Sequence, residues 1–128
     1  MMLTRKDIQQ RLAESGLDLN RCWLIAGGAL IFYGLRTVTA DIDMGCTSSL
    51  ADELEAAGHP AEREGEGRRR FHLPGCIDLS ENWAEGTVTM MDGVPVVSLE
   101  DVLALKRALG REKDQADIAA IQRLLQEN

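Results

Sequence analysis

Apolar residues recur along the chain with two different spacings, and the first of these is helical. Ile8 and Leu12 lie four residues apart, which places both side chains on one face of a helix. Thr4 precedes them, and Asp7 stands three residues after it, a spacing that resembles a capping box. The pattern therefore predicts a helix over about residues 4–15, ended by the glycine that follows.

Two further segments have the continuous apolar or Thr/Val-rich character of buried strands. The first covers residues 22–26 and the second residues 40–46, and a short helix is predicted between them at 28–34. After the second strand, Ser48 or Ser49 can cap a helix whose apolar residues recur at helical spacing until a glycine ends it.

The second half of the chain begins with a segment that the sequence describes only weakly. Residues 59–70 combine glycines with alternating charge, which is typical of either a weak strand or a mobile loop. Two strand-like pieces follow at 71–73 and 76–79, with a Pro-Gly turn between them. An Asp-Gly pair between two apolar runs then predicts a β-hairpin over residues 87–97.

Two helices are predicted after the hairpin. Ser98 and Asp101 repeat the capping spacing, and an apolar stripe at helical spacing continues as far as Gly110. Asp114 can cap the last helix, with Asp117 in its first turn.

Length and charge restrict what the chain can be. With 128 residues, 45% of them hydrophobic, it is predicted to form a single domain over residues 1–128 around one core. A net charge of −7 argues against an extended nucleic-acid surface. The exception is the basic run Arg68–Arg70 beside Arg63, which is typical of either a phosphate-binding patch or a solvated strand edge.

Cysteine usage and hydropathy indicate the compartment. Cys22, Cys46 and Cys76 have neither disulfide-framework nor zinc-site spacing, so we expect a reducing cytosol. Cys22 and Cys76 fall in strand-like runs and are predicted to be buried as small hydrophobic residues. No apolar stretch is long enough for a membrane span, and the N-terminus lacks a signal-peptide core, so a cytoplasmic protein is predicted.

The chemistry is concentrated around two short motifs. Asp41 and Asp43 flank Ile42, and because strand side chains alternate, both carboxylates project to one side and can share divalent cations. Gly27-Gly28 closes the first apolar run where a strand turns into a helix, and the backbone N–H groups of such a turn attract phosphate oxygens. The pattern predicts a site for a metal ion and a triphosphate.

These motifs together resemble the signature of the polymerase-beta-type nucleotidyltransferase superfamily. The resemblance is strongest to the small branch that includes lincosamide and aminoglycoside nucleotidyltransferases and abortive-infection toxins. It is carried by Gly27-Gly28, Gly34, Arg36 and Thr39-Ala40-Asp41-Ile42-Asp43-Met44, and more weakly by Leu105-Lys106 and the run from Gly110 to Asp117.

The resemblance implies a fold and a reaction. The fold is a minimal nucleotidyltransferase fold of the α/β (α+β) class, with a mixed sheet flanked by helices and two C-terminal helices. The reaction is transfer of a nucleoside monophosphate from a nucleoside triphosphate, bound with Mg²⁺ or Mn²⁺, to a hydroxyl of a small molecule, protein or RNA. Asp41 and Asp43 bind the metal, and Gly27, Gly28 and Arg36 contact the phosphates.

A third carboxylate and two lysines complete the implied site. In the family a later strand supplies an acid that binds metal and takes the proton of the attacking hydroxyl; Asp78 matches this role, with Glu81 as a competitor. Asp78 can instead be a surface residue at a strand end. Lys106 and Lys113 match a lysine of the nucleotide site, but lysines in helices and between helices are also usually just solvent-facing.

Two features leave the function open. Many members of the superfamily have Gly-Ser where this chain has Gly27-Gly28, so a hydroxyl contact to phosphate is absent here. The chain also lacks the helical domain with which larger relatives bind the acceptor, so the acceptor site must come from the C-terminal helices, a second copy or a partner protein. The alternative is a non-catalytic nucleotide- or partner-binding module of a toxin-antitoxin-like system. A calcium loop at 41–47 lacks the necessary further ligands.

Overall fold

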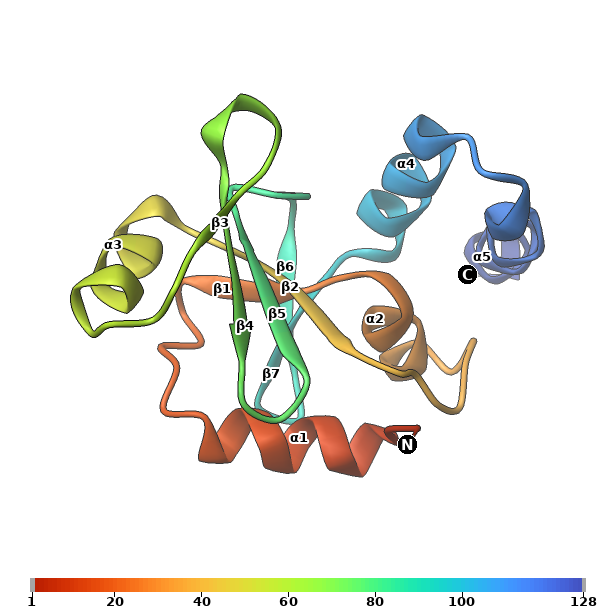
Figure 1. Ribbon diagram of the computed structural model, residues 1–128. Coiled ribbons are helices and arrows are strands. Elements are labelled where there is room, and N and C mark those ends of the chain that lie inside the picture. The colour runs from red at the N-terminus through yellow and green to blue at the C-terminus, as the bar shows by residue number, and fades with distance from the viewer. Residues whose placement is uncertain (1, 128) are drawn as a thin grey trace.

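The computed structural model describes residues 2–127, within which seven strands form one mixed sheet and five α-helices accompany it (Figure 1). The α-helices are α1 (Arg5–Glu14), α2 (Ala26–Phe32), α3 (Ser48–Ala56), α4 (Leu99–Leu109) and α5 (Gln115–Glu127). The strands are β1 (Cys22–Leu24), β2 (Ile42–Cys46), β3 (Glu62–Arg63), β4 (Arg69–Leu73), β5 (Ile77–Glu81), β6 (Val88–Met91) and β7 (Val94–Val97). Two short 3₁₀ turns are η1 (Gly65–Gly67) and η2 (Glu112–Asp114).

The sheet mixes parallel and antiparallel pairs. Its strand order is β3-β4-β5-β2-β1-β7-β6, with β2–β5 and β1–β7 parallel and the other pairs antiparallel. The two parallel pairs require crossovers, which α2 and α3 help to supply. The mixed α/β class is therefore confirmed.

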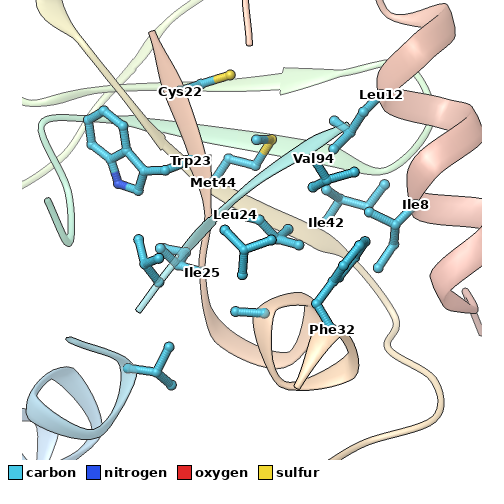
Figure 2. Packing of buried hydrophobic residues seen from close by; sticks show 14 of the residues in the cluster. Ile8, Leu12, Cys22, Trp23, Leu24, Ile25, Phe32, Ile42, Met44 and Val94 are labelled. Atoms are coloured by element: carbon cyan, nitrogen blue, oxygen red, sulfur yellow. The ribbon is translucent and has the colours of Figure 1, made fainter. Parts of the chain in front are cut away.

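The register gives the sheet one apolar face in its centre. Ile42 and Met44 of β2 lie opposite Ile77 and Leu79 of β5, and all four side chains are buried. Figure 2 shows Leu24 near the middle of this core, between strands and the helix residues Ile8 and Leu12 that cover it. Because strand residues alternate, the intervening positions, among them Asp43 and Asp78, face the other side.

Local capping chemistry sets most helix ends. Thr4 and Asp7 form the predicted capping box of α1, and the Ser98 hydroxyl accepts a hydrogen bond from the Asp101 N–H at the start of α4. Gly110 ends α4 with a left-handed backbone. The prediction that Ser48 or Ser49 caps α3 is wrong. The N-cap residue is Thr47, whose hydroxyl accepts a hydrogen bond from the Leu50 N–H in the first turn of the helix.

The hairpin and the glycine-rich segment differ in how far the sequence predicted them. Asp92 and Gly93 have φ of 50° and 80°, the conformation of a two-residue hairpin turn, as expected. Residues 59–70 hold more order than a loop, because Glu62–Arg63 form β3 and Arg69 already begins β4.

Two further expectations were wrong. Cys76 is exposed in the turn between β4 and β5, with φ of 63°, whereas Cys22 is buried as predicted. Asp114 lies in η2, and its carboxylate is held by Lys106 and Arg111. Within residues 2–127, no helix combines the length and the apolar character needed to cross a membrane.

Candidate functional site

Two aspartates face each other across the parallel strands β2 and β5. Asp43 pairs with Asp78 in register, so both carboxylates lie on the same side of the sheet, and Asp41 directly precedes β2. The pKa of Asp43 is raised, first by burial and then by the negative charges of Asp78 and Asp41, against which Arg70 acts only in part. The face therefore carries an excess of negative charge at Asp43.

The Asp78 carboxylate is engaged by two basic side chains from β4. His72 Nδ1 lies 2.5 Å from Asp78 Oδ1, and Arg70 Nη2 lies 3.7 Å from Asp78 Oδ2. His72 also contacts Glu62 through Nε2 at 3.1 Å. These contacts raise the pKa of His72, chiefly through the Asp78 hydrogen bond and then through Glu62. Asp78 is thus oriented by His72 and Arg70.

A strained turn at Ala26 places the glycine pair close to Asp43. The Ile25 N–H donates to the Asp43 carbonyl oxygen at 3.0 Å, so the end of β1 lies beside the start of β2. Ala26, the next residue, has φ of 57°, a left-handed conformation that is costly for a residue with a Cβ atom. Such outliers often occur at functional sites, and this one directly precedes Gly27.

The two glycines of the pair face different surroundings. A Cβ atom on Gly27 would lie 2.5 Å from Arg36 Nη1 and 2.9 Å from Thr39 Oγ1, so the Arg36 guanidinium lies directly against Gly27. A Cβ atom on Gly28 would lie 2.8 Å from Leu24 Cδ1 in the core. The structure therefore brings Gly27 and Arg36 together, whereas Gly28 serves the close packing of α2 on β1.

An ion-pair network links Arg36 to the two C-terminal helices. Arg36 Nη2 lies 2.9 Å from Asp117 Oδ2, and Lys106 Nζ lies 3.3 Å from the same oxygen. Lys106 Nζ also donates to Asp114 Oδ1 at 3.0 Å, and both of these side chains are buried. Lys106 is thus a buried structural cation beside Arg36, while Lys113 is exposed on η2 and stands apart from the network.

Glu81, the competing third carboxylate, belongs to another cluster. Arg69 Nη2 lies 2.6 Å from Glu81 Oε2, and Arg69 also pairs with Asp52 and Glu55 of α3. The hydrogen bond from Arg69 is the main cause that lowers the pKa of Glu81 to about 2. Glu81 lies three positions along β5 from Asp78 and points to the other face, which leaves Asp78 as the partner of Asp43.

Asp41, Asp43 and Asp78 are ligands of the type that a divalent cation prefers, but their side chains are not arranged as a preformed metal site. Carboxylate oxygens are the ligands that Mg²⁺ and Mn²⁺ prefer, and a cation would relieve the charge that raises the pKa of Asp43. Within residues 2–127, however, no three His, Cys, Asp or Glu side chains form a ready-made metal site. Asp78 would have to turn from His72 to join Asp41 and Asp43.

The arginines of the basic run, Arg68–Arg70 and Arg63, form ion pairs with nearby acidic side chains. Arg68 and Arg70 both contact Glu64, Arg63 lies near Glu55, and the partly buried Arg69 pairs with Asp52, Glu55 and Glu81. The structure thus favours a paired strand edge over a free phosphate-binding patch.

Sequence reasoning missed His72 and Arg70 as neighbours of the carboxylates. Both stand at alternate positions of β4, which is the only local signal that they share a face. The register that pairs His72 with Asp78 is a tertiary feature that no spacing within β4 reveals.

Comparison of the chain with known proteins matched no model of a protein family, no curated protein and no solved structure. The function must therefore be argued from the site itself.

Proposed function

We propose that the chain is a metal-dependent nucleotidyltransferase on a minimal nucleotidyltransferase fold. It moves a nucleoside monophosphate from a nucleoside triphosphate to a hydroxyl of a small molecule, protein or RNA. The observation that carries the proposal is the position of Asp43. Asp43 stands opposite Asp78 in the register of β2 and β5, and its carbonyl oxygen accepts a hydrogen bond from the N–H of Ile25, which precedes the Ala26–Gly27 turn.

The chain's own residues divide into a carboxylate group and a phosphate group. Asp41, Asp43 and Asp78 are the metal ligands, and bound Mg²⁺ or Mn²⁺ supplies the positive charge that neutralises the triphosphate. The Gly27 backbone and the Arg36 guanidinium bind the terminal phosphates, because they lie against each other and Gly27 stands two residues after Ile25, whose N–H donates to the Asp43 carbonyl oxygen.

The remaining residues position the reacting groups. The acceptor oxygen bonds to the α-phosphorus, the bond to the bridging oxygen breaks, and pyrophosphate leaves. Asp78 accepts the hydroxyl proton as a base after it has turned from His72 toward Asp41 and Asp43. Lys106 acts indirectly, since it holds Asp117, which in turn holds Arg36. Lys113, exposed on η2 and apart from this network, is the candidate for an outer phosphate contact.

The test is titration calorimetry with each nucleoside triphosphate, with and without Mg²⁺. We expect magnesium-dependent binding that the double variant Asp41→Asn/Asp43→Asn loses. Asp92→Asn is the control, because it removes one negative charge, which pairs with Arg5, from an exposed hairpin turn in which Asn tolerates a positive φ. Absence of binding to every triphosphate would reject the proposal for the isolated chain.

A second candidate is a non-catalytic nucleotide- or partner-binding module. The observation that favours it is that Asp78 and Lys106 both have partners within the chain already. A pyrophosphate-release assay with small-molecule, protein and RNA hydroxyl acceptors separates the two. Release that depends on Asp43 supports the transferase, and tight nucleotide binding without release across these acceptors supports the module.

A further inference from the structure

The two edges of the sheet differ in how they are protected. One edge is β3, which has only two residues, and both of them, Glu62 and Arg63, are charged and exposed. The other edge is β6, whose four residues Val88–Met91 carry no charge. Short, charged edges resist pairing with other chains, whereas an uncharged edge strand offers a template for it. The molecule thus blocks one edge and leaves the other open.

The open edge presents backbone groups from alternate residues. Around the Asp92–Gly93 turn, Met91 pairs with Val94, and the Thr87 carbonyl oxygen accepts from the Ser98 N–H at 2.8 Å. In an antiparallel pair, hydrogen-bonded positions alternate along the strand. Thr87, Thr89 and Met91 therefore direct their backbone groups toward β7, and Val88 and Met90 direct theirs outward.

The same two residues expose apolar side chains. Val88 is 41% exposed and Met90 is 54% exposed, and within residues 2–127 they account for two of the four large hydrophobic residues that are exposed. They project from one face of the hairpin because they stand two positions apart on a strand. Free backbone groups and exposed apolar side chains thus coincide at Val88 and Met90.

We propose that two copies of this chain associate by antiparallel pairing of β6 with β6, about a two-fold axis at Thr89. This register brings Val88 opposite the second copy's Met90, and Met90 opposite the second copy's Val88. The four outward backbone groups of each copy then form four hydrogen bonds, and four apolar side chains cover one another on one face. The sheet continues from one copy into the other.

A second copy fits this edge because the strand is complementary to itself. Outward residues meet outward residues, apolar side chains meet apolar side chains, and Thr89 meets Thr89, a favourable cross-strand pair. The nearest acidic residue of the strand, Asp92, falls opposite Gly86 of the second copy and not opposite another acidic residue of β6. The net charge of −7 on each copy opposes association at long range, and salt screens that repulsion. Association should therefore strengthen as salt is added.

Sedimentation velocity over a concentration series tests the proposal. We expect a monomer–dimer equilibrium for the natural chain that shifts toward dimer with added salt. The variants Val88→Lys/Met90→Lys and Val88→Glu/Met90→Glu should each sediment as a monomer at every concentration, because like charges face each other across the axis. Mixing the two variants should restore a dimer, because lysine then meets glutamate. Circular dichroism verifies that both variants stay folded, which is expected since the substituted side chains are exposed.

Three results would overturn the proposal. One is a natural chain that stays monomeric throughout the series, and another is a dimer that survives both double substitutions. The third is failure of the mixed variants to associate, which would reject the register centred on Thr89. Nucleotide binding is measured separately and does not enter this test, so the interface and the proposed transferase activity stand or fall independently.

Discussion

Burial and the neighbouring negative charges both raise the pKa of Asp43. Burial raises the pKa of its carboxyl, and so do the carboxylates of Asp78 and Asp41, while Arg70 compensates only in part. A carboxyl whose folded-state pKa is raised destabilises the fold wherever it is ionised, and the penalty disappears as the pH falls through that raised pKa. The clustered carboxylates thus lower the free energy of unfolding when they are ionised, and such a cost is common at ligand-binding sites.

Asp43→Asn should therefore stabilise the chain without metal. Near neutral pH we expect a gain of up to about 1 kcal/mol in the free energy of unfolding, the upper range of cross-strand pair energies. The gain should vanish at acidic pH, where Asp43 of the natural chain is protonated. Urea unfolding of both proteins at the two pH values measures this. Added Mg²⁺ should narrow the difference, because it stabilises only the natural chain.

An equal loss of stability in Asp43→Asn at all pH values would contradict this account. It would mean that the carboxylate makes a stabilising contact in the folded chain. Asp92→Asn is again the control, and its small effect should not follow the titration of a raised pKa.

At this scale the sequence predicts residue pairs within a strand better than pairs between strands. Asp41 and Asp43 follow from alternation alone, and Gly27 follows from its place after an apolar run. The prediction of Asp78 as the third carboxylate required its strand to lie beside the strand of Asp43. In the structure the two strands, β5 and β2, are neighbours. The His72 contact depends on antiparallel register, and the burial of Lys106 depends on two aspartates one helix away.

Between elements, one partly buried arginine connects a helix to two strands. Arg69 starts β4, contacts Asp52 and Glu55 of α3, and makes its best-buried ion pair with Glu81 of β5. The side chains of Arg69 and Glu81 are only 12% and 13% exposed, so this pair is poorly screened by water. The pKa of Glu81 falls from 4.5 to about 2 as a result, mainly through the Arg69 hydrogen bond.

Glu81→Gln should lower stability in a pH-dependent way. A depressed folded-state pKa contributes stability that is complete above the unfolded value of 4.5 and is lost as the pH falls toward about 2. Near neutral pH we expect a cost of about 2 kcal/mol, typical of a hydrogen bond to a charged group. Urea unfolding from neutral to acidic pH should show the two proteins converging. The exposed Glu85→Gln is the control, and its curve should stay parallel to that of the natural chain.

Parallel curves for Glu81→Gln as well would mean that the Arg69–Glu81 pair contributes nothing to folding. The other acidic partners of Arg69, Asp52 and Glu55, would then be sufficient to hold α3.

Elements were predictable where local chemistry decides them. The capping box before α1, the Ser98–Asp101 cap of α4 and the Asp92–Gly93 turn each act within four residues. Residues 59–70 were not, because β3 exists only through pairing with β4, and its exposed charged residues carry no apolar pattern. The start of α2 at Ala26 was missed because a non-glycine residue there takes a left-handed backbone.

Over the whole molecule, local neutralisation of the arginines decides what the surface can bind. The net charge is −7, and the basic run that would be the exception is paired with Glu64, Glu81 and other acidic groups. A surface binds nucleic acid mainly by replacing counterions at phosphates, which requires cations that are not already paired. For the transferase proposed above, this surface therefore favours a small or cationic acceptor over a large nucleic acid.

We expect no measurable binding of duplex DNA or of unstructured single-stranded RNA at physiological salt. Fluorescence anisotropy with labelled oligonucleotides tests this, and lowering the salt should give at most weak binding of gentle salt dependence. Glu64→Gln is the informative variant, because it removes the acidic partner that Arg68 and Arg70 share, together with one negative charge. It should bind RNA more tightly than the natural chain.

Tight RNA binding by the natural chain, with a steep loss of affinity on adding salt, would contradict this expectation. It would show that the ion pairs of the arginines open readily, and RNA would then become the favoured class of acceptor.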